Sequence, residues 1–589
     1  MALLDLIVIF LYFALVIGVG VYYSKKASKD LNSYFLGDKK MHWLTLAMSG
    51  SVSNFDVTGT MWMVSVLFLL GMKSWWHHWM WGVMLPAFGL AYMAGWVRKS
   101  GVITGAEWMS TRFGDDAGGK AARMVYALMA VITCASFIGY AFQGIGKFAT
   151  VYIHLENLAD YLPILSTLVT THKAQTLAVL VLGITTLYVV LGGLFGVVVT
   201  DVIQTIILTL AGLLIVAIAF VKVSPEVANQ VTPPGWESLW PVWRIPEYKG
   251  TENAAYEMFG LLTLVWIIKG FFLNSGGPGQ MYDFQRYLAA RDHKDAAKVA
   301  AAWPFFLVIR WAMVAAITLL ALAGFADVKD PEMVMPQVLQ HYLPVGLRGL
   351  VIAGFLAAFM STFSSTSNSG ASYIIKDIWQ PMFRPDADEK QLVRGSYLAT
   401  IAIVAVGIII GWNAESISSI WGWIMMALGG GVIVPNVLRW YWWRTNGWGY
   451  AAGTMAGILL SLIPLIWKLP VYVTFPIICA GSFAASVAAS MLTPPTERAV
   501  LVNFYQKVRP FGIWSAVKDG DEAANKGGFL ADARDPVINT LTAVVGMTGL
   551  YIGPMYLVGH WRCEASVWLA VSAISAVVLY FRWYKKLEQ

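Results

Sequence analysis

Long apolar stretches separated by short polar loops dominate this chain. Windows of about twenty hydrophobic residues, enough for a helix to cross the hydrocarbon core of a bilayer, recur from one end to the other. The pattern predicts transmembrane helices near 4–23, 45–70, 77–97, 124–154, 174–198, 200–222, 257–275, 303–326, 346–375, 393–412, 416–436, 448–468, 470–491, 537–558 and 565–583. We therefore expect an all-α polytopic membrane protein with about fifteen spans.

Composition supports a membrane protein and removes several functional classes. The chain is 58% hydrophobic and only 13% charged, with a mean hydropathy of +0.62, which excludes an ordinary soluble protein. Its net charge of +7 arises from basic residues in short loops, where they set topology, so no nucleic-acid partner is expected. Cys134, Cys479 and Cys563 show no paired spacing, and no Walker-type, HExxH or GxSxG motif occurs. We expect neither an enzyme nor an organic cofactor.

Lys and Arg are concentrated in one set of alternating loops. The opposite loops are poorer in these residues, although 223–256 still holds Arg244 and Lys249. By the positive-inside rule the basic set is cytoplasmic, which places the N-terminus outside and the C-terminus inside a plasma (cytoplasmic) membrane. The first hydrophobic segment, 3–22, lacks a preceding basic region and is predicted to be a retained helix rather than a signal peptide.

This orientation makes 45–70 and 257–275 run in opposite directions, each at the start of a block of five spans. The expected organisation is an extra helix and basic loop at 1–44, a first inverted repeat at 45–222, an extracytoplasmic loop at 223–256, a second repeat at 257–436, and C-terminal helices at 437–589 with a cytoplasmic loop near 493–536. Each leading span carries a polar interruption, at Ser49–Asn54 and at Asn274–Gly279. Paired broken helices indicate the central site of an ion-driven transporter, although small residues also permit close helix packing.

A run of hydroxyl groups lies within the span at 346–375. Because a helix has about 3.6 residues per turn, Ser361, Ser364, Ser365 and Asn368 share one face. Neutral oxygens in this arrangement suit a partly dehydrated Na⁺. For Ser361 and Thr362 the alternative is that the hydroxyl bonds back to the preceding helical turn.

Four motifs identify a family resemblance. They are Thr104–Gly114 (TGAEWMSTRFG), Gly192–Leu194 followed by Thr200 and Asp201, Gln285–Ala290 (QRYLAA), and Asn368–Ser369 with Asp377–Ile378 downstream. Together they resemble the sodium:solute symporter family, whose members carry sugars, proline, sialic acid and vitamins. The resemblance covers about 1–515 and implies a LeuT-like 5+5 inverted repeat with one extra N-terminal helix and additional C-terminal helices. The last two spans lie beyond this core and receive no role.

The resemblance implies a set of sodium ligands. A first site takes Ser49 and Val52 from the first broken helix and Ala358, Ser361 and Thr362 from the serine-rich helix, where unwound backbone frees carbonyl groups. A second site takes Ser361, Ser364, Ser365 and Asp201. Na⁺ is therefore the expected coupling ion, with one or two ions per cycle. Asp201 has a structural alternative, as a salt-bridge partner or helix cap near the cytoplasm.

Polar residues beside the two interruptions are candidate solute ligands: Ser51, Ser53, Asp56 and Asn274. Asp56 stands where sugar-carrying relatives usually have an amide and resembles the carboxylate of proline carriers. It can bind an ammonium group, accept sugar hydroxyls, serve ion coupling, or pair structurally with Lys269 or Lys147.

Aromatic residues and buried charges complete the candidates. Trp75 and His78 match solute contacts of the family, where aromatic faces stack on a sugar or an organic cation; the alternative is an interfacial belt, which is favoured for Trp79 and Trp81. Trp421 and Trp423 are candidates of the same kind. Lys147, Lys269 and Arg310 lie in apolar surroundings and are functional candidates by position alone.

These observations predict a symporter that couples inward Na⁺ flux to uptake of a small polar solute. A sugar is slightly preferred; a proline-like amino acid or an amine is the alternative. A membrane solute sensor with a symporter fold is the competing class. The expected partners are the solute, Na⁺ and the lipid bilayer, and a monomer suffices for transport.

Overall fold

The structure is a computed structural model that describes residues 2–27, 41–102, 104–153, 171–251, 253–277, 281–325, 328–467, 469–518 and 529–588. Within these ranges the chain is helical, and its only β-type pairings are two isolated bridges, Met41 with Ala290 and Trp442 with Ile513. The all-α prediction is confirmed.

The α-helices are α1 (Leu3–Ala27), α3 (Trp43–Ser53), α4 (Val57–Leu70), α5 (Trp75–Trp79), α6 (Leu85–Phe88), α7 (Ala94–Lys99), α8 (Glu107–Phe113), α9 (Ala117–Tyr152), α12 (Lys173–Lys222), α13 (Pro225–Val231), α14 (Phe259–Ser275), α15 (Met281–Ala289), α16 (His293–Gly324), α17 (Val334–Tyr342), α18 (Leu347–Ser372), α19 (Gln380–Phe383), α20 (Glu389–Trp412), α21 (Ile417–Gly422), α22 (Gly429–Tyr441), α23 (Gly447–Leu460), α24 (Ile463–Trp467), α25 (Val471–Leu492), α26 (Arg498–Val508), α27 (Ser515–Lys518), α28 (Phe529–Val558), α29 (Arg562–Leu579) and α30 (Lys585–Glu588). Several are joined by π-helical turns, including η3 (Met80–Met84), η8 (Tyr373–Trp379) and η9 (Trp423–Leu428).

Many of these helices are long and apolar enough to cross a membrane. Eleven such helices occur in the described ranges, and three shorter apolar helices accompany them. Polar side chains in the connecting loops begin several of them. The Asp116 carboxylate accepts the backbone N–H of Gly119 at the start of α9, and Asp388 and Gln391 form a capping box at the start of α20.

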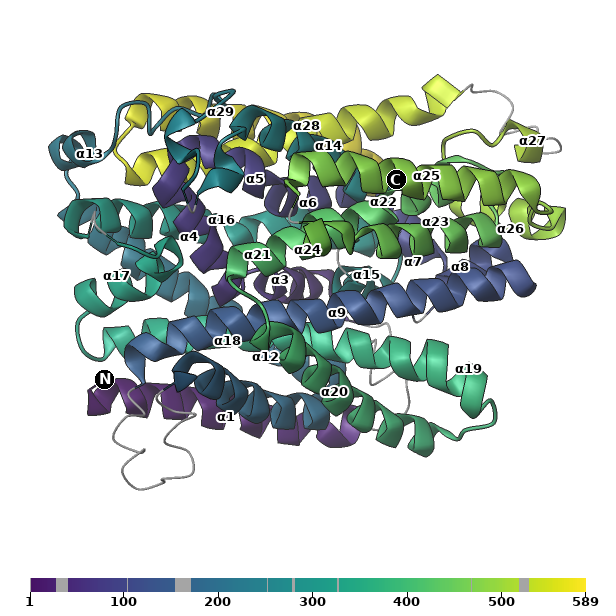
Figure 1. Cartoon of the computed structure of the whole chain (residues 1–589), viewed down its shortest axis with the longest axis horizontal. Coiled ribbons are helices and arrows are strands. Elements are labelled where there is room, and N and C mark those ends of the chain that lie inside the picture. Colours follow the sequence, from purple (N-terminus) through teal and green to yellow (C-terminus); the bar gives the residue numbers. More distant parts are fainter. Residues whose placement is uncertain are drawn as a thin grey trace.

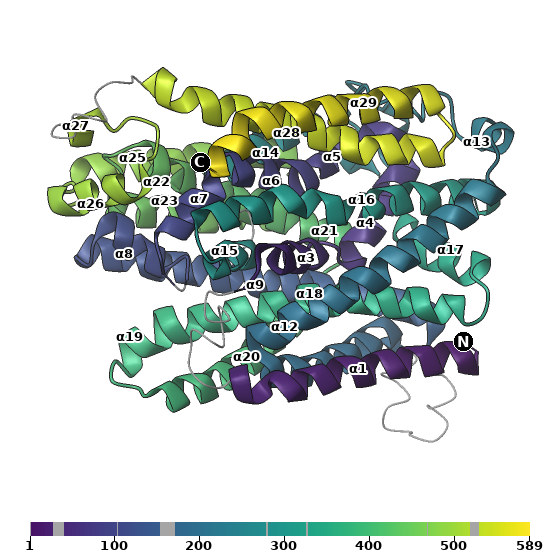
Figure 2. The same cartoon turned by 180° about the vertical axis from the view of Figure 1, so that it is seen from behind.

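The helices are arranged around the two interrupted ones. In Figures 1 and 2, α28 and α29 lie along one side of the molecule and α1 and α20 along the opposite side. Between them lie α3, α4 and α15, with α9, α16 and α18 around them. This arrangement puts the first broken helix, α3 and α4, in the interior.

The spans predicted at 174–198 and 200–222 both lie within the residues of α12, whose apolar stretches are Lys173–Leu187 and Val198–Lys222. One expectation about a single element needs revision. The first helix break lies at 54–56, just after the predicted Ser49–Asn54 segment, so Ser49 to Ser53 remain helical.

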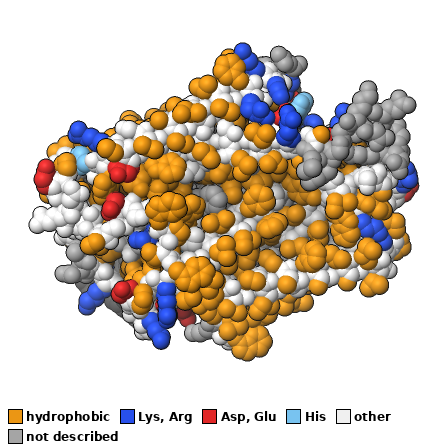
Figure 3. All heavy atoms as spheres, turned by 90° about the horizontal axis from the view of Figure 1, so that it is seen from above, with side chains coloured by type: hydrophobic (Ala, Val, Ile, Leu, Met, Phe, Trp, Pro, Cys, Tyr) orange, Lys and Arg blue, Asp and Glu red, His pale blue; other side chains and the backbone are white. Residues whose placement is uncertain are grey.

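The surface agrees with a lipid environment. Figure 3 shows the side of the molecule on which α28 and α29 lie, where hydrophobic side chains cover most of the face and charged side chains gather toward its margins. Helix α29 contributes exposed apolar residues, including Val567, Ile574 and Val577. A broad apolar face of this size is expected where protein meets hydrocarbon.

Candidate solute and sodium sites

The first helix break is built by polar groups that replace the missing helical hydrogen bonds. Helix α3 ends where the backbone N–H of Asn54 turns back to Ser51 and Val52, while its side chain donates to the Gly50 carbonyl. Helix α4 then starts at the N-cap Asp56, whose carboxylate accepts the backbone N–H of Gly59 at 2.9 Å. The break therefore presents a carboxylate inside the membrane domain.

A cavity opens at this break. Helices α3, α4, α9, α16, α18 and α21 and the π-turn η3 surround it. It is lined by Ser53, Asn54, Asp56, Gly59, Trp62, Met63, Gly82, Phe137, Tyr140, Leu307, Arg310, Trp311, Thr362 and Trp421. Aromatic walls with a few converging polar groups are typical of small-molecule sites.

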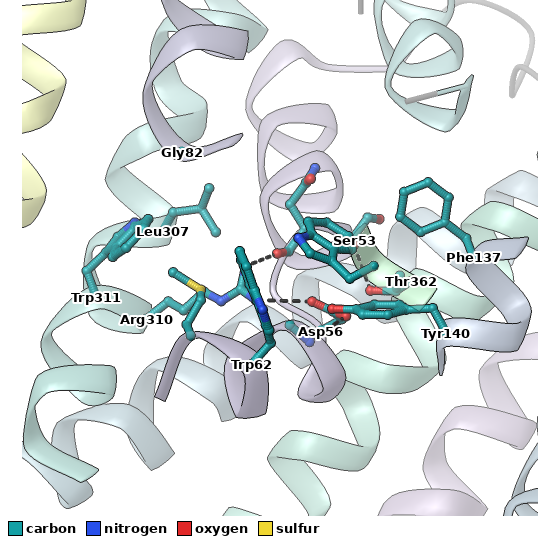
Figure 4. Close-up of a pocket in the computed structure, with 14 residues that line it drawn as sticks. Ser53, Asp56, Trp62, Gly82, Phe137, Tyr140, Leu307, Arg310, Trp311 and Thr362 are labelled. Atoms are coloured by element: carbon teal, nitrogen blue, oxygen red, sulfur yellow. Dashed lines mark hydrogen bonds and ion pairs between the residues drawn. The ribbon is translucent and has the colours of Figure 1, made fainter. Parts of the chain in front are cut away.

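An ion pair forms the polar centre of this cavity. One Arg310 guanidinium nitrogen lies 3.1 Å from an Asp56 carboxylate oxygen, and both side chains are largely buried, with 9% and 13% of their surfaces exposed. The guanidinium also donates to the Asn54 carbonyl and to the Thr60 hydroxyl. Figure 4 shows the pair between the Trp62 and Tyr140 rings. Of the alternatives weighed for Asp56, a structural partner exists, but it is Arg310 rather than Lys269 or Lys147.

The serine-rich face of α18 meets α3 and α12 in a second polar cluster. Asp201, on α12, accepts hydrogen bonds from Ser49 at 2.5 Å and from Ser361 at 2.6 Å. Ser53 lies 2.9 Å from the Ser365 hydroxyl and 3.3 Å from that of Ser361. All of these side chains are buried. The structure thus brings Asp201, Ser361 and Ser365 into one cluster, as the family resemblance implied, and adds Ser53 to them.

A cation from the chain itself sits in this cluster. One Arg286 guanidinium nitrogen donates to Ser49, Ser53 and Ser365, at 3.2, 3.1 and 2.5 Å. It lies 3.7 Å from the Asp201 carboxylate, and neither side chain has more than 1% of its surface exposed. Since an ionised carboxylate in a membrane requires a counter-charge, Arg286 supplies it in this conformation.

The residues of the first expected sodium site lie beside the same cluster. The Thr362 hydroxyl donates to the Ser53 carbonyl at 2.6 Å and to the Ala358 carbonyl at 3.2 Å, which joins α18 to the end of α3. The Val52 carbonyl accepts the backbone N–H groups of Asn54 and Phe55. The Thr362–Ala358 bond is the back-bonding foreseen for Thr362, and Ser364 also bonds back, to the Ser361 carbonyl at 3.1 Å.

Other sequence candidates lie elsewhere. Ser51 borders a separate, smaller cavity, and the Asn274 amide donates back to the Gly270 carbonyl. Trp75 is buried behind the main cavity wall, 4.5 Å between ring centroids from Trp311. Of His78 the structure describes the backbone, within α5, and not the side chain. Lys147 pairs with Asp330 and Glu332.

Sequence reasoning missed most of the aromatic residues that line the cavity. Trp62, Phe137, Tyr140 and Trp311 sit in apolar helices where an aromatic residue looks like any other lipid-facing or core residue. The role of Arg286 was also missed, because its motif falls between the predicted spans at 257–275 and 303–326. For Arg310 a signal existed: a lone arginine within an apolar span.

Comparison with known proteins decides the family. Residues 34–457 match the family model described as "Sodium:solute symporter family". The chain belongs to the sodium:solute symporter family. The fold agrees: a solved Na⁺-coupled sialic acid symporter in a substrate-bound, outward-open state superposes with a TM-score of 0.64, at 18% identity, covering 84% of this chain and 99% of that one.

Curated relatives of this symporter carry different solutes. It is 24% identical over 507 residues to sodium/glucose cotransporter 4 of Danio rerio, covering 79% of this chain and 72% of the relative. It is also 24% identical over 508 residues to the high-affinity proline transporter PutP of Bacillus subtilis (strain 168), covering 82% and 97%. The predicted resemblance and LeuT-like fold are confirmed, and the symporter is a multi-pass sodium-coupled transporter of a small solute. Sugar and proline transport both remain consistent with these relatives.

Proposed function

We propose that this symporter uses an inward Na⁺ gradient to take up a small polar solute without net charge, bound in the cavity at the break between α3 and α4. The observation that carries the proposal is the Asp56–Arg310 pair, 3.1 Å apart, between aromatic walls. A carboxylate next to a guanidinium offers acceptors and donors while adding no net charge, so a neutral polyhydroxy compound such as a sugar fits best. The rings of Trp62, Tyr140 and Trp421 supply stacking faces for it.

A zwitterionic amino acid is the second candidate. The same ion pair can open around such a solute, with its ammonium group on Asp56 and its carboxylate on Arg310. The two candidates differ in what they require of Arg310, because only the zwitterion needs the bidentate guanidinium.

We propose that Na⁺ binds at Ser49, Val52, Ala358, Ser361 and Thr362, and that a second ion uses Ser361, Ser364, Ser365 and Asp201. Arg286 already bonds to Ser365 and faces Asp201, so a second Na⁺ and the guanidinium compete for the same oxygens. Binding of the second ion therefore requires Arg286 to withdraw. Because coupling is reciprocal, solute binding must tighten Na⁺ binding by the same factor as Na⁺ tightens solute binding.

The test is uptake into proteoliposomes containing the purified protein. Radiolabelled D-glucose, myo-inositol and L-proline are supplied with an inward Na⁺ gradient, with equal Na⁺ on both sides, or with K⁺ in its place. Accumulation that needs the Na⁺ gradient supports the proposal. If no solute of a broadened panel accumulates under an imposed gradient while the protein still binds one of them, the sensor alternative replaces it.

A further inference from the structure

Helix α28 lies outside residues 34–457, yet it reaches the solute cavity from behind. Its residues pack against α16, α6 and the π-turn η3. Tyr551, in its C-terminal third, has 0% of its surface exposed although the helix lies along the side of the molecule in Figure 1. A large aromatic residue on this helix is therefore directed into the protein rather than toward lipid.

Tyr551 forms a three-ring cluster with Trp75 and Trp311, which we call the aromatic wall. The Tyr551 and Trp311 rings stack with centroids 5.5 Å apart and planes at 28°. Trp75 lies 4.5 Å from Trp311 and 6.2 Å from Tyr551. Only Trp311 of the three lines the cavity, so Trp75 and Tyr551 form the layer that holds it. Figure 4 shows Trp311 near Leu307 on the side of the cavity toward Gly82.

Gly82 brings the same layer directly to the cavity surface. A Cβ atom at this position would lie 2.9 Å from a Tyr551 ring carbon and 3.1 Å from the Trp311 indole nitrogen. Since Gly82 itself lines the cavity, no further layer of side chains separates the solute space from Tyr551 at this point. A change in the size of residue 551 must move Trp311 or leave a void beside the cavity.

From this geometry we infer that Tyr551 is a positioning residue for solute specificity: its ring fixes Trp311 and thereby the shape of the cavity wall. The inference rests on the proposed use of the cavity as the solute site. It gives one of the two C-terminal spans beyond the family core a function, which is to adapt a shared transport core to its particular solute.

The first test compares Tyr551→Leu, Tyr551→Phe and Tyr556→Leu. The Tyr551 hydroxyl has no hydrogen-bond partner among the described residues, so phenylalanine keeps the ring without orphaning a polar group. Tyr556 is also buried on α28, but it bonds to the Glu237 carbonyl in the 223–256 loop and controls for general damage to the helix. Uptake of D-glucose, myo-inositol and L-proline gives KM and maximal rate for each solute that accumulates.

We expect Tyr551→Leu to raise the KM of the preferred solute about fivefold and to change the KM ratio between solutes, with maximal rate and half-saturating Na⁺ within twofold of the parent. Tyr551→Phe should have the same KM as the unmodified protein, and Tyr556→Leu should leave the ratio of KM values between solutes unchanged. A Trp311→Phe/Tyr551→Leu double variant no worse than the worse single variant supports action through Trp311. Fully additive effects, or equal losses in Tyr551→Leu and Tyr556→Leu, would overturn the inference.

A second readout does not depend on transport. In protein whose three cysteines are replaced by alanine, Met63→Cys places a thiol in the cavity lining. The rate at which a small methanethiosulfonate labels this thiol reports the shape of the cavity around it. Tyr551→Leu should change this rate at least about threefold, and Tyr556→Leu should not. An unchanged rate rejects the positioning role even if the uptake KM of Tyr551→Leu differs from that of the unmodified protein. If the labelling rate changes but no panel solute is taken up, the positioning role of Tyr551 is supported and the proposed function is contradicted.

Discussion

At the scale of single residues, two buried Asp–Arg pairs organise the site. Asp56–Arg310 faces the solute cavity, and Asp201–Arg286 lies within the serine cluster. Removing one partner of a buried pair leaves an uncompensated charge, which typically costs about 3–5 kcal/mol. A substitution in either pair therefore affects both transport and protein stability. The variants below are chosen so that these two effects can be measured separately.

Asp56→Asn should raise the solute KM at least about tenfold, equivalent to about 1.4 kcal/mol, because Arg310 loses its counter-charge and the solute loses a charged acceptor. The amide oxygen of asparagine still accepts the Gly59 N–H, so α4 keeps its N-cap. Uptake kinetics and protein yield measure both effects. A normal KM would exclude Asp56 from the solute site.

Gly59→Ala should also impair solute binding. A Cβ atom here would lie 2.4 Å from an Asp56 carboxylate oxygen, 2.7 Å from Arg310 and 2.9 Å from the Tyr140 hydroxyl, so all three polar groups must shift. We expect a KM increase of about tenfold with little loss of folded protein, since flexible side-chain ends give way first. Gly18→Ala, with no atom within 4 Å of the added Cβ, is the matched control.

Ser365→Ala and Asp201→Asn should each weaken Na⁺ dependence and lower its Hill coefficient if two ions are coupled. Asp201→Asn should also destabilise the protein by about 3 kcal/mol, because Arg286 stays buried without its carboxylate. Ser365→Ala removes only a hydroxyl and separates the ion effect from the folding effect. Unchanged Na⁺ curves in both variants would remove the second sodium site.

At the scale of elements, the junctions between helices hold the broken helices in place. Gly71 follows α4 with φ of +69°, and a Cβ atom there would lie 2.4 Å from the Trp236 carbonyl oxygen. That carbonyl also accepts the Met72 N–H at 2.7 Å. The junction therefore fixes the 223–256 loop to the end of the first broken helix.

Gly71→Ala should lower the free energy of unfolding in detergent by about 2 kcal/mol. Alanine at this position is strained by the positive φ, and its Cβ atom would clash with the Trp236 carbonyl. Gly183→Ala, in α12 with no atom within 4 Å, should leave stability unchanged or slightly improved. Melting followed by fluorescence measures both. Equal melting temperatures for the two variants would show that the junction does not constrain the fold.

At the scale of the whole molecule, the orientation of the chain in the membrane stays a prediction. With the N-terminus outside and about fifteen spans, the connection between α28 and α29 faces the exterior. Cys563 lies at the start of α29 and is exposed, whereas Cys134 is buried and Cys479 half-buried. An exposed cysteine at this end of α29 therefore reports the orientation directly.

A membrane-impermeant maleimide should label Cys563 from outside intact cells, and Cys563→Ser should abolish the signal. Labelling that requires permeabilised cells would invert the predicted topology. Cys563 is exposed and does not line the cavity, so uptake by Cys563→Ser protein should be normal.

Sequence and tertiary structure contributed different parts of this description. The long apolar spans, the glycine- and serine-rich interruptions and the motifs around Asp201 and Asn368 determined the fold class and the family, because these signals are local or periodic. Helix-face periodicity also predicted that Ser361 and Ser365 act together.

Only the tertiary structure decided which charges and rings meet. Asp56 and Arg310 are far apart in sequence, as are Asp201 and Arg286, and no local pattern pairs them. The aromatic wall draws on α5, α16 and α28, while aromatic residues at other positions of such helices face lipid or core. Hydrophobicity therefore specified the helices, whereas the packing of helices distant in sequence specified the site.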